Sequence, residues 1–155
     1  MKKRDFIIAA AIPIFVGVLA ALLTKDGMMA FDQMKQPPLT PPAWVFPVVW
    51  TILYALMGIA SYLVTVSGKD SLAVDEALLF YGLQLTFNFL WTLVFFGFSK
   101  YFPAFWVLTA LWLLIFHTIR LFGPISKRAA YLMVPYLIWV TFAGYLNLGV
   151  WWLNQ

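Results

Sequence analysis

Five long apolar stretches constrain the fold of this chain more than any other feature. Residues 6–24, 44–67 and 129–153 contain no charged side chain, and residues 75–99 and 103–122 carry charges only near their ends. A helix of about 20 apolar residues crosses the hydrocarbon core of a bilayer. Only 10% of the residues are charged, against about 25% in a soluble domain. The sequence therefore predicts an all-α integral membrane protein, a single domain over residues 1–155 with five transmembrane helices in one bundle.

The connections between these stretches differ in length. Most are short and predict antiparallel neighbours, whereas residues 25–43 form a long segment that we expect to be non-helical. Prolines at positions 37, 38, 41 and 42 stiffen this segment and remove backbone donors. Pro47 follows closely and is tolerated in a helix only within its first turn. We interpret the proline-rich segment as a rigid lid over the start of the second helix.

The basic residues predict an orientation in the membrane. Seven lie on the side of the N-terminus, namely Lys2, Lys3, Arg4, Lys69, Arg120, Lys127 and Arg128, and three lie on the other side, namely Lys25, Lys35 and Lys100. The positive-inside rule then places the N-terminus in the cytoplasm and the C-terminus outside. The first stretch lacks a convincing cleavage site and is expected to be retained as a helix. The net charge of +4 lies at the ends of apolar stretches, so anionic lipid headgroups explain it and nucleic acid does not.

The distribution of reactive side chains excludes several classes of chemistry. The chain has no cysteine, which excludes disulfides and thiol catalysis. Its six carboxylates lie at helix ends or in loops, so a proton pump, acid–base hydrolysis and a zinc site have no support. His117 is the only histidine and has no partner ligand. We expect it to be an interfacial or hydrogen-bonded residue rather than a haem ligand, and we expect no metal site.

Three of the predicted helices each carry aromatic and polar residues at helical spacing on one face. These are Trp50 and Tyr54 on the second helix, Gln84, Asn88, Trp91 and Phe95 on the third, and Tyr136, Trp139, Ala143 and Asn147 on the fifth. If the three faces converge, they enclose a mostly apolar pocket for a small molecule. Alternatively, Gln84 and Asn88 bond only to neighbouring helices. A stripe of small residues on the first helix (Ala9, Pro13, Gly17 and Ala21) serves either internal packing or dimerisation.

Three blocks of sequence resemble the TspO/MBR family, the tryptophan-rich sensory proteins and translocator proteins also called the peripheral benzodiazepine receptor family. The blocks are residues 37–57, with the pattern PP…PPxWVFPxVWTxLYxLM, residues 80–97, and residues 134–147. Together they span about half of the chain, and the number of predicted helices fits the family. The chain most resembles a bacterial member of this family.

The resemblance implies a five-helix bundle, often a homodimer, that binds tetrapyrroles such as protoporphyrin IX and haem. It also implies binding of isoquinoline carboxamide and benzodiazepine ligands, and light- and oxygen-dependent breakdown of protoporphyrin without a required cofactor. Two tryptophans needed for that breakdown match Trp50 and Trp139. Tyr54, Gln84, Asn88, Trp91, Phe95 and Ala143, with Phe31, Pro41 and Pro42 from the loop, complete the expected ligand contacts.

The sequence departs from the family pattern in two places. Two loop tryptophans and a loop lysine are absent, and Ala30, Phe31 and Gln36 are among the residues that stand in that segment. No basic residue follows Tyr145, so the sterol-binding motif of the family is incomplete. Two alternatives to porphyrin breakdown stay open: a porphyrin transporter or regulatory sensor without catalysis, and a structural bundle without a ligand.

Overall fold

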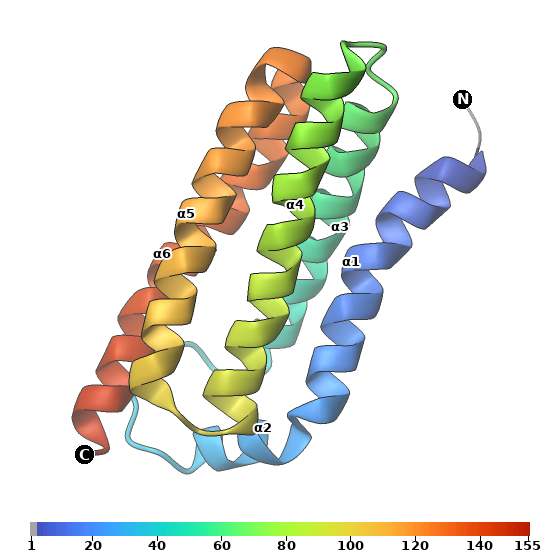
Figure 1. The fold of residues 1–155 in the computed structure, drawn as a ribbon. Helices are drawn as coiled ribbons and strands as arrows, with labels where there is room; N and C mark the ends of the chain where they lie inside the picture. The colour runs from blue at the N-terminus through green and yellow to red at the C-terminus, as the bar shows by residue number, and fades with distance from the viewer. Residues whose placement is uncertain (1–2) are drawn as a thin grey trace.

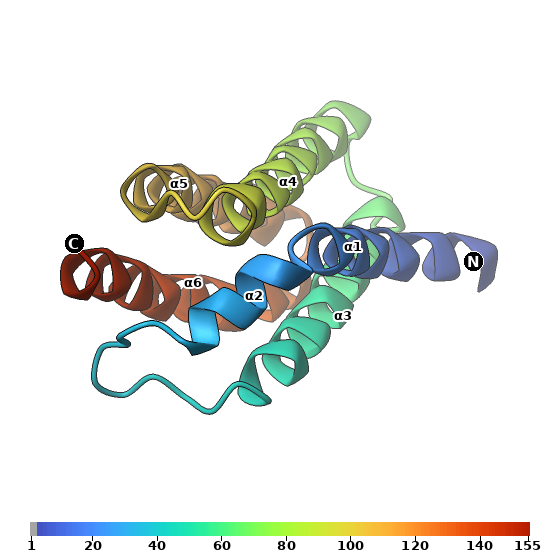
Figure 2. The ribbon, with the colours of Figure 1, turned by 90° about the horizontal axis from the view of Figure 1, so that it is seen from below.

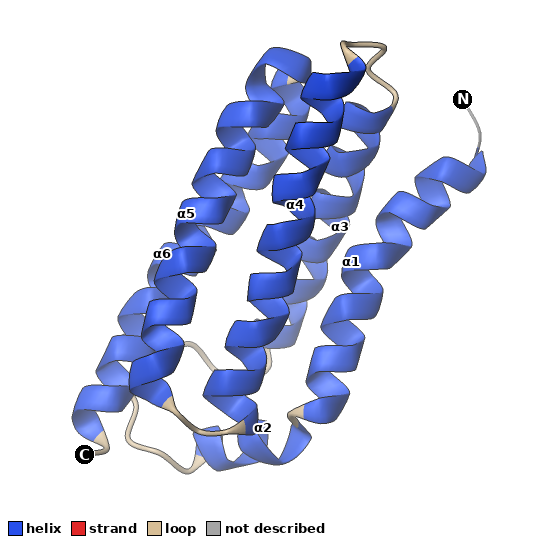
Figure 3. Ribbon diagram, viewed as in Figure 1, coloured by secondary structure: helices blue, strands red, loops and turns tan. Residues whose placement is uncertain are grey.

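A computed structural model describes residues 3–155, and in this part of the chain every regular element is a helix (Figures 1 and 3). In chain order the elements are α1 (Lys3–Leu23), α2 (Lys25–Asp32), α3 (Val45–Thr65), α4 (Ser71–Thr92), the π-helix η1 (Leu93–Gly97), α5 (Tyr101–Ile125) and α6 (Lys127–Leu153). Lys2, one of the residues used to predict the orientation, lies outside the described residues.

Five of the helical stretches are long and apolar enough to cross a membrane. They are α1, α3, α4 together with η1, α5 and α6, each of 21 to 27 residues. At 1.5 Å per residue, even the shortest of them spans about 30 Å, the thickness of the hydrocarbon core. The prediction of an all-α, five-helix membrane bundle is confirmed. Because the number of spans is odd, the beginning of α1 and the end of α6 lie at opposite ends of the bundle (Figure 1).

The order of the helices around the bundle differs from their order in the chain. α1 packs mainly against α3, α3 against α6, α6 against α5, and α5 against α4 (Figure 2). α1 is the peripheral member, because only 11% of its membrane-spanning window is buried inside the protein. Its outward side chains, among them Ile7, Phe15 and Leu22, are exposed and suited to contact with lipid.

Small residues bring α1 and α3 into close contact. A Cβ atom added to Gly17 would overlap the ring of Tyr54, lying 2.8 Å from its Cδ2 atom. A Cβ atom added to Gly58 would lie 2.6 Å from the Cα atom of Ala10. Glycine at both positions is required because no side chain fits between the two helices. At Gly17, therefore, the stripe of small residues predicted on the first helix serves packing inside the chain.

Several helix boundaries differ from the prediction. The predicted non-helical segment 25–43 is wrong at its start, because α2 occupies Lys25–Asp32. The fourth span extends to Ile125 instead of ending before Gly123, and the fifth begins at Lys127. The cap of α4 is also one residue earlier than expected. Asp70, rather than Ser71, accepts a hydrogen bond from the backbone N–H of Ala73, at 3.1 Å, because a carboxylate satisfies a free N–H in the first turn.

Helix α2 lies across the end of the bundle where α1 finishes and α3 begins (Figure 2). Its apolar residues Met28 and Phe31 are three positions apart and share one face. Phe31 is buried, whereas Lys25 and Asp26 are exposed. This amphipathic pattern explains the helix in a segment whose glycine and acidic residues predict a loop. α2 therefore covers one end of the bundle interior.

Candidate ligand-binding site

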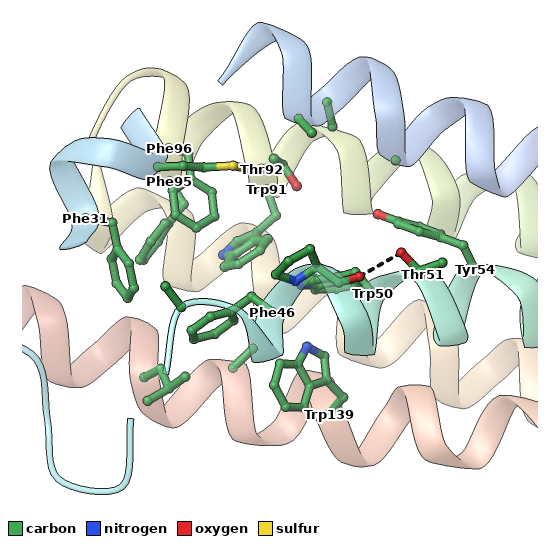
Figure 4. A pocket seen from close by; sticks show the side chains of 18 of the residues that line it. Phe31, Phe46, Trp50, Thr51, Tyr54, Trp91, Thr92, Phe95, Phe96 and Trp139 are labelled. Carbon is green, nitrogen blue, oxygen red and sulfur yellow. Dashed lines mark hydrogen bonds between the residues drawn. The ribbon is translucent and has the colours of Figure 1, made fainter. Parts of the chain in front are cut away.

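A partly open cavity of about 440 Å³ lies beneath α2, within the size range of small-molecule sites. Side chains from α1, α2, α3, α4, η1 and α6 line it, and most of them are apolar (Figure 4). The aromatic members of the lining are Phe31, Phe46, Trp50, Tyr54, Trp91, Phe95, Phe96 and Trp139. The cavity thus combines apolar walls with many flat ring faces, an arrangement suited to a planar ligand.

Trp50 is the centre of the aromatic wall on α3. Its ring stacks on Tyr54 of the same helix, with centroids 5.6 Å apart and an interplanar angle of 29°. Trp91 of α4 lies 6.5 Å from Trp50, and Tyr136 of α6 meets Trp50 edge to face at 6.3 Å. Three helices therefore hold one indole from three sides. This packing fixes the orientation of the Trp50 ring before any ligand enters.

Trp139 of α6 forms another part of the wall. Its ring packs against Phe46 of α3, with centroids 6.0 Å apart. The indole nitrogen Nε1 of Trp139 is buried and has no hydrogen-bond partner among the described residues. Figure 4 shows this nitrogen on the edge of the ring that faces Trp50. A buried N–H without an acceptor is unfavourable, so a carbonyl, carboxylate or ring nitrogen that reached it would gain a hydrogen bond.

A chain of three polar side chains lies behind the Trp50 wall. The hydroxyl of Tyr54 donates to Asn88 Oδ1 at 2.9 Å, and Asn88 Nδ2 donates to the hydroxyl of Tyr136 at 2.8 Å. Asn88 is fully buried and links α3, α4 and α6 in the middle of the bundle. Because Tyr54 and Tyr136 both contact Trp50, this amide holds the rings that fix the indole.

The side-chain amide of Asn147 holds the ring of Trp91 in place. Trp91 Nε1 donates to Asn147 Oδ1 of α6 at 2.9 Å, and Asn147 Nδ2 donates to the backbone oxygen of Tyr101 at 2.7 Å. Asn147 thus ties α4, α5 and α6 together at one side of the cavity. The N–H of Trp91 is already paired and is not offered to a ligand, in contrast to that of Trp139.

The π-helix η1 turns two successive phenylalanines toward the cavity. It follows α4 directly, and its last turn is closed by a bond from Phe98 N–H to the Leu93 oxygen at 2.8 Å. Because a π-turn places residues five apart above one another, both Phe95 and Phe96 pack against Trp91, with centroids 5.2 and 6.0 Å away. A regular α-helix would turn one of them away.

Helix α2 closes the cavity above these rings. Phe31 packs against Phe46, Phe95 and Phe96, with centroids 5.7 to 6.1 Å apart. Gly27 rests on the backbone of η1, where an added Cβ atom would overlap the carbonyl oxygen of Phe96. Any side chain at position 27 therefore forces α2 away from η1. We call α2 the roof of the cavity. Contact between Gly27 and the backbone of η1 fixes the position of its first turn.

The structure brings together seven of the eleven expected ligand contacts. The lining contains Phe31, Trp50, Tyr54, Trp91, Phe95, Trp139 and Ala143. Gln84 and Asn88 are fully buried but do not line the cavity: Gln84 Nε2 lies 3.9 Å from the sulfur of Met57, and Asn88 bonds the two tyrosines. Pro41 and Pro42 also lie outside the lining, because the proline-rich segment runs past the side of α6 while α2 forms the roof (Figure 2).

The cavity is also lined by residues that were not expected at the site from the sequence. They come from α1, α2, α3 and η1 and include Ile14, Gly17, Val18, Met28, Phe46, Thr51 and Phe96. The helical spacing of Phe46, Trp50 and Tyr54 is a signal that places Phe46 on the aromatic face of α3. Met28 carried no signal because its segment was expected to be a loop.

The lining has little capacity for acid–base or metal chemistry. Asp32, exposed at the end of α2, is the only ionisable group of the Asp, Glu, His, Lys or Arg type that borders the cavity. Within residues 3–155 no group of three or more His, Cys, Asp or Glu side chains is placed to hold a metal ion. His117 is exposed on α5, where its ring meets Phe80 at 4.4 Å, and does not line the cavity. The lining is therefore suited to stacking against a flat molecule.

The fold and the cavity define an integral membrane protein with a partly open, aromatic-lined cavity inside a bundle of five membrane-spanning helices. The sequence profile of the TspO/MBR family matches residues 9–153. Protein CrtK of Rhodobacter capsulatus is 40% identical over 80% of this chain and 78% of its own length. The tryptophan-rich sensory protein of Cereibacter sphaeroides is 40% identical over 96% and 89%, and the translocator protein of Bos taurus is 34% identical over 93% and 86%. The chain belongs to the TspO/MBR family.

Proposed function

We propose that this protein binds a tetrapyrrole such as protoporphyrin IX or haem in the cavity beneath α2. One observation carries the proposal: three tryptophans from three helices line one cavity, and one of them presents a buried N–H without a partner. A porphyrin is a flat, largely apolar macrocycle with carboxylate and nitrogen acceptors. The ring faces of Trp50 and Trp91 suit its plane, and Trp139 Nε1 suits an acceptor on its edge.

The proposal includes light- and oxygen-dependent breakdown of the bound porphyrin. An illuminated porphyrin can take an electron from an adjacent indole or generate reactive oxygen next to it. Trp50 and Trp139 border the cavity directly and are the side chains proposed for this role. The reaction requires no acid–base pair, which agrees with a lining whose only carboxylate is the exposed Asp32. It also requires no resident cofactor.

Replacing Trp139 by phenylalanine tests this reaction. We expect the rate of photoproduct formation to fall at least about tenfold, because the variant lacks both the oxidisable indole and its N–H donor. The measurement is the absorbance spectrum of protoporphyrin IX during illumination in air with the purified protein. Trp106→Phe is the control, since Trp106 is exposed on α5 and does not line the cavity. Equal rates in Trp139→Phe and the wild type would refute the assigned role.

A second candidate is a transporter or regulatory sensor that handles porphyrin without altering it. It is favoured by the exposed residues Ile14, Val18 and Thr51 in the lining, which place part of the cavity wall against the bilayer. Porphyrin flux across proteoliposomes in the dark, above that of empty vesicles, would support this function. If dark flux equals that of empty vesicles and illumination still yields photoproducts, only porphyrin breakdown remains as the function.

Further properties belong to the same proposal. The protein would reside in a bacterial cell membrane, with membrane lipid around it, the N-terminus in the cytoplasm and α2 on the outer side. The cavity would also accept isoquinoline carboxamide and benzodiazepine-type ligands, which are aromatic and carry carbonyl acceptors. We propose a homodimer as the assembled form.

Site-specific labelling of single cysteines introduced at Lys35 and Lys69 would report the orientation of the protein in the membrane. These two residues lie at opposite ends of the bundle, because Lys35 precedes α3 and Lys69 follows it.

A further inference from the structure

The roof of the cavity is held differently at its two ends. At its beginning, α2 follows α1 almost directly, and Gly27 lies against the backbone of η1. At its end, α2 runs into the segment of residues 33–44, which has no regular structure beyond turns. Gln36 ties this segment back to α2, because its Nε2 donates to the Phe31 oxygen at 3.1 Å. The position of Phe31 therefore depends on what holds residues 33–36.

Asn154, the residue that follows the last turn of α6, holds this segment through its side chain. Asn154 Oδ1 accepts the backbone N–H of Lys35 at 3.1 Å, and Asn154 Nδ2 donates to the backbone oxygen of Lys35 at 2.7 Å. The amide thus pairs with both polar backbone groups of one residue, as a neighbouring strand would. Nδ2 also donates to the Val150 oxygen at 2.8 Å, which fixes the rotamer of Asn154 on its own helix.

Three other contacts hold the residues on either side of Lys35 against α6 and α5. The hydroxyl of Tyr145 donates to the Pro38 oxygen at 2.7 Å. Pro37 is buried against Gly149, where an added Cβ atom would lie 2.7 Å from the Pro37 Cβ atom. The hydroxyl of Tyr101 donates to the sulfur of Met34 at 2.9 Å. Of the side chains that contact residues 34–38 in this way, only Asn154 pairs with both the N–H and the carbonyl oxygen of one residue. That residue, Lys35, lies three positions after the end of α2.

We propose that the Asn154–Lys35 pair is a latch that controls opening of the roof, and thereby the rate at which a ligand enters and leaves the cavity. When the pair breaks, the end of α2 and Phe31 swing away from Phe46 and Phe95, while Gly27 stays against η1 as the hinge. Neither Asn154 nor Lys35 lines the cavity, so breaking the latch leaves the contacts of a bound ligand unchanged. It therefore changes the exchange rate and leaves the equilibrium affinity nearly unchanged. The proposal depends on the proposed function only for the choice of probe.

The experiment compares Asn154→Ala with the wild type in lipid nanodiscs. Protoporphyrin IX is bound first, and its release to an excess of phosphatidylcholine vesicles is followed by recovery of tryptophan fluorescence. We expect release and binding rates to rise together by about 5- to 20-fold, as the loss of two hydrogen bonds predicts, with the dissociation constant changed less than threefold. Asn154→Asp keeps the acceptor for the Lys35 N–H but loses the donor, and should give an intermediate rate. Gln155→Ala is the matched control.

Amide hydrogen exchange gives a second readout that needs no ligand. Residues 28–36 should exchange faster in Asn154→Ala than in the wild type, while α4 should be unchanged. If protoporphyrin does not bind at all, the proposed function fails, and the exchange data still decide whether the latch exists. Unchanged exchange in residues 28–36 would overturn the proposal. Faster exchange with an unchanged release rate would also overturn it, because the ligand would then leave by another route, such as between α1 and α3.

Discussion

Replacing Ala143 by phenylalanine should raise the dissociation constant for protoporphyrin IX at least about 30-fold. Ala143 lines the cavity from α6, one helical turn from Trp139. A phenyl ring at this position occupies the space beside Trp139 and prevents the macrocycle from reaching two of its aromatic contacts. Stacking on an aromatic side chain stabilises a flat heteroaromatic ring by roughly 1–3 kcal/mol, so losing two contacts gives this loss of affinity.

The measurement is a titration of protoporphyrin IX in the dark, followed by quenching of tryptophan fluorescence. Ile138→Phe is the matched control, because Ile138 lies on the same helix, is 65% exposed and does not line the cavity. We expect the control to bind like the wild type. A thermal unfolding curve for each variant establishes that the bundle is intact. Tight binding by a folded Ala143→Phe variant would place the porphyrin elsewhere on the protein.

Replacing Asn88 by leucine should lower the free energy of unfolding by about 2–4 kcal/mol. Leucine has a similar volume, so the change leaves the packing nearly filled. It removes the acceptor of the Tyr54 hydroxyl and the donor to the Tyr136 hydroxyl, both of them buried. In the bilayer no water replaces these partners, although the unfolded helices find other partners there, which limits the loss.

Denaturation in mixed micelles measures this loss, with Thr86→Val as the control. The hydroxyl of Thr86 is exposed and bonds only to the Gly82 oxygen of its own helix, so its removal should change stability by less than about 0.5 kcal/mol. Adding Tyr54→Phe and Tyr136→Phe to Asn88→Leu should restore much of the stability, because the two hydroxyls that lost their partner are then removed. If Asn88→Leu alone is as stable as the wild type, the polar chain does not hold the bundle together.

The spans and the aromatic faces could be predicted because each depends on a local pattern. Length and the absence of charge indicated the five membrane helices. Spacing of three and four residues placed Trp50 with Tyr54 and Trp91 with Phe95. These patterns involve one helix at a time. The resemblance to the TspO/MBR family then indicated which faces belong to one site.

The remaining parts of the site depend on contacts between segments distant in the chain. Nothing in residues 93–97 distinguishes a π-turn from an α-helix, so the inward position of Phe96 was not predictable from spacing. Gly27 was interpreted as a loop residue, although its small size is required by contact with η1. Asn88 shares the ligand-facing stripe of α4 in sequence, but Tyr54 and Tyr136 lie between it and Trp50 in the folded bundle.

The central claim is that the cavity bounded by Trp50, Trp91 and Trp139 is the tetrapyrrole site. The most direct test is an experimental structure of the protein with protoporphyrin IX bound in a lipid environment. We expect the macrocycle beneath α2, with its plane against Trp50 and Trp91 and an acceptor within hydrogen-bond distance of Trp139 Nε1. Porphyrin bound instead on the lipid-facing surface, with the Trp139 N–H still unpaired and the cavity empty, would contradict it.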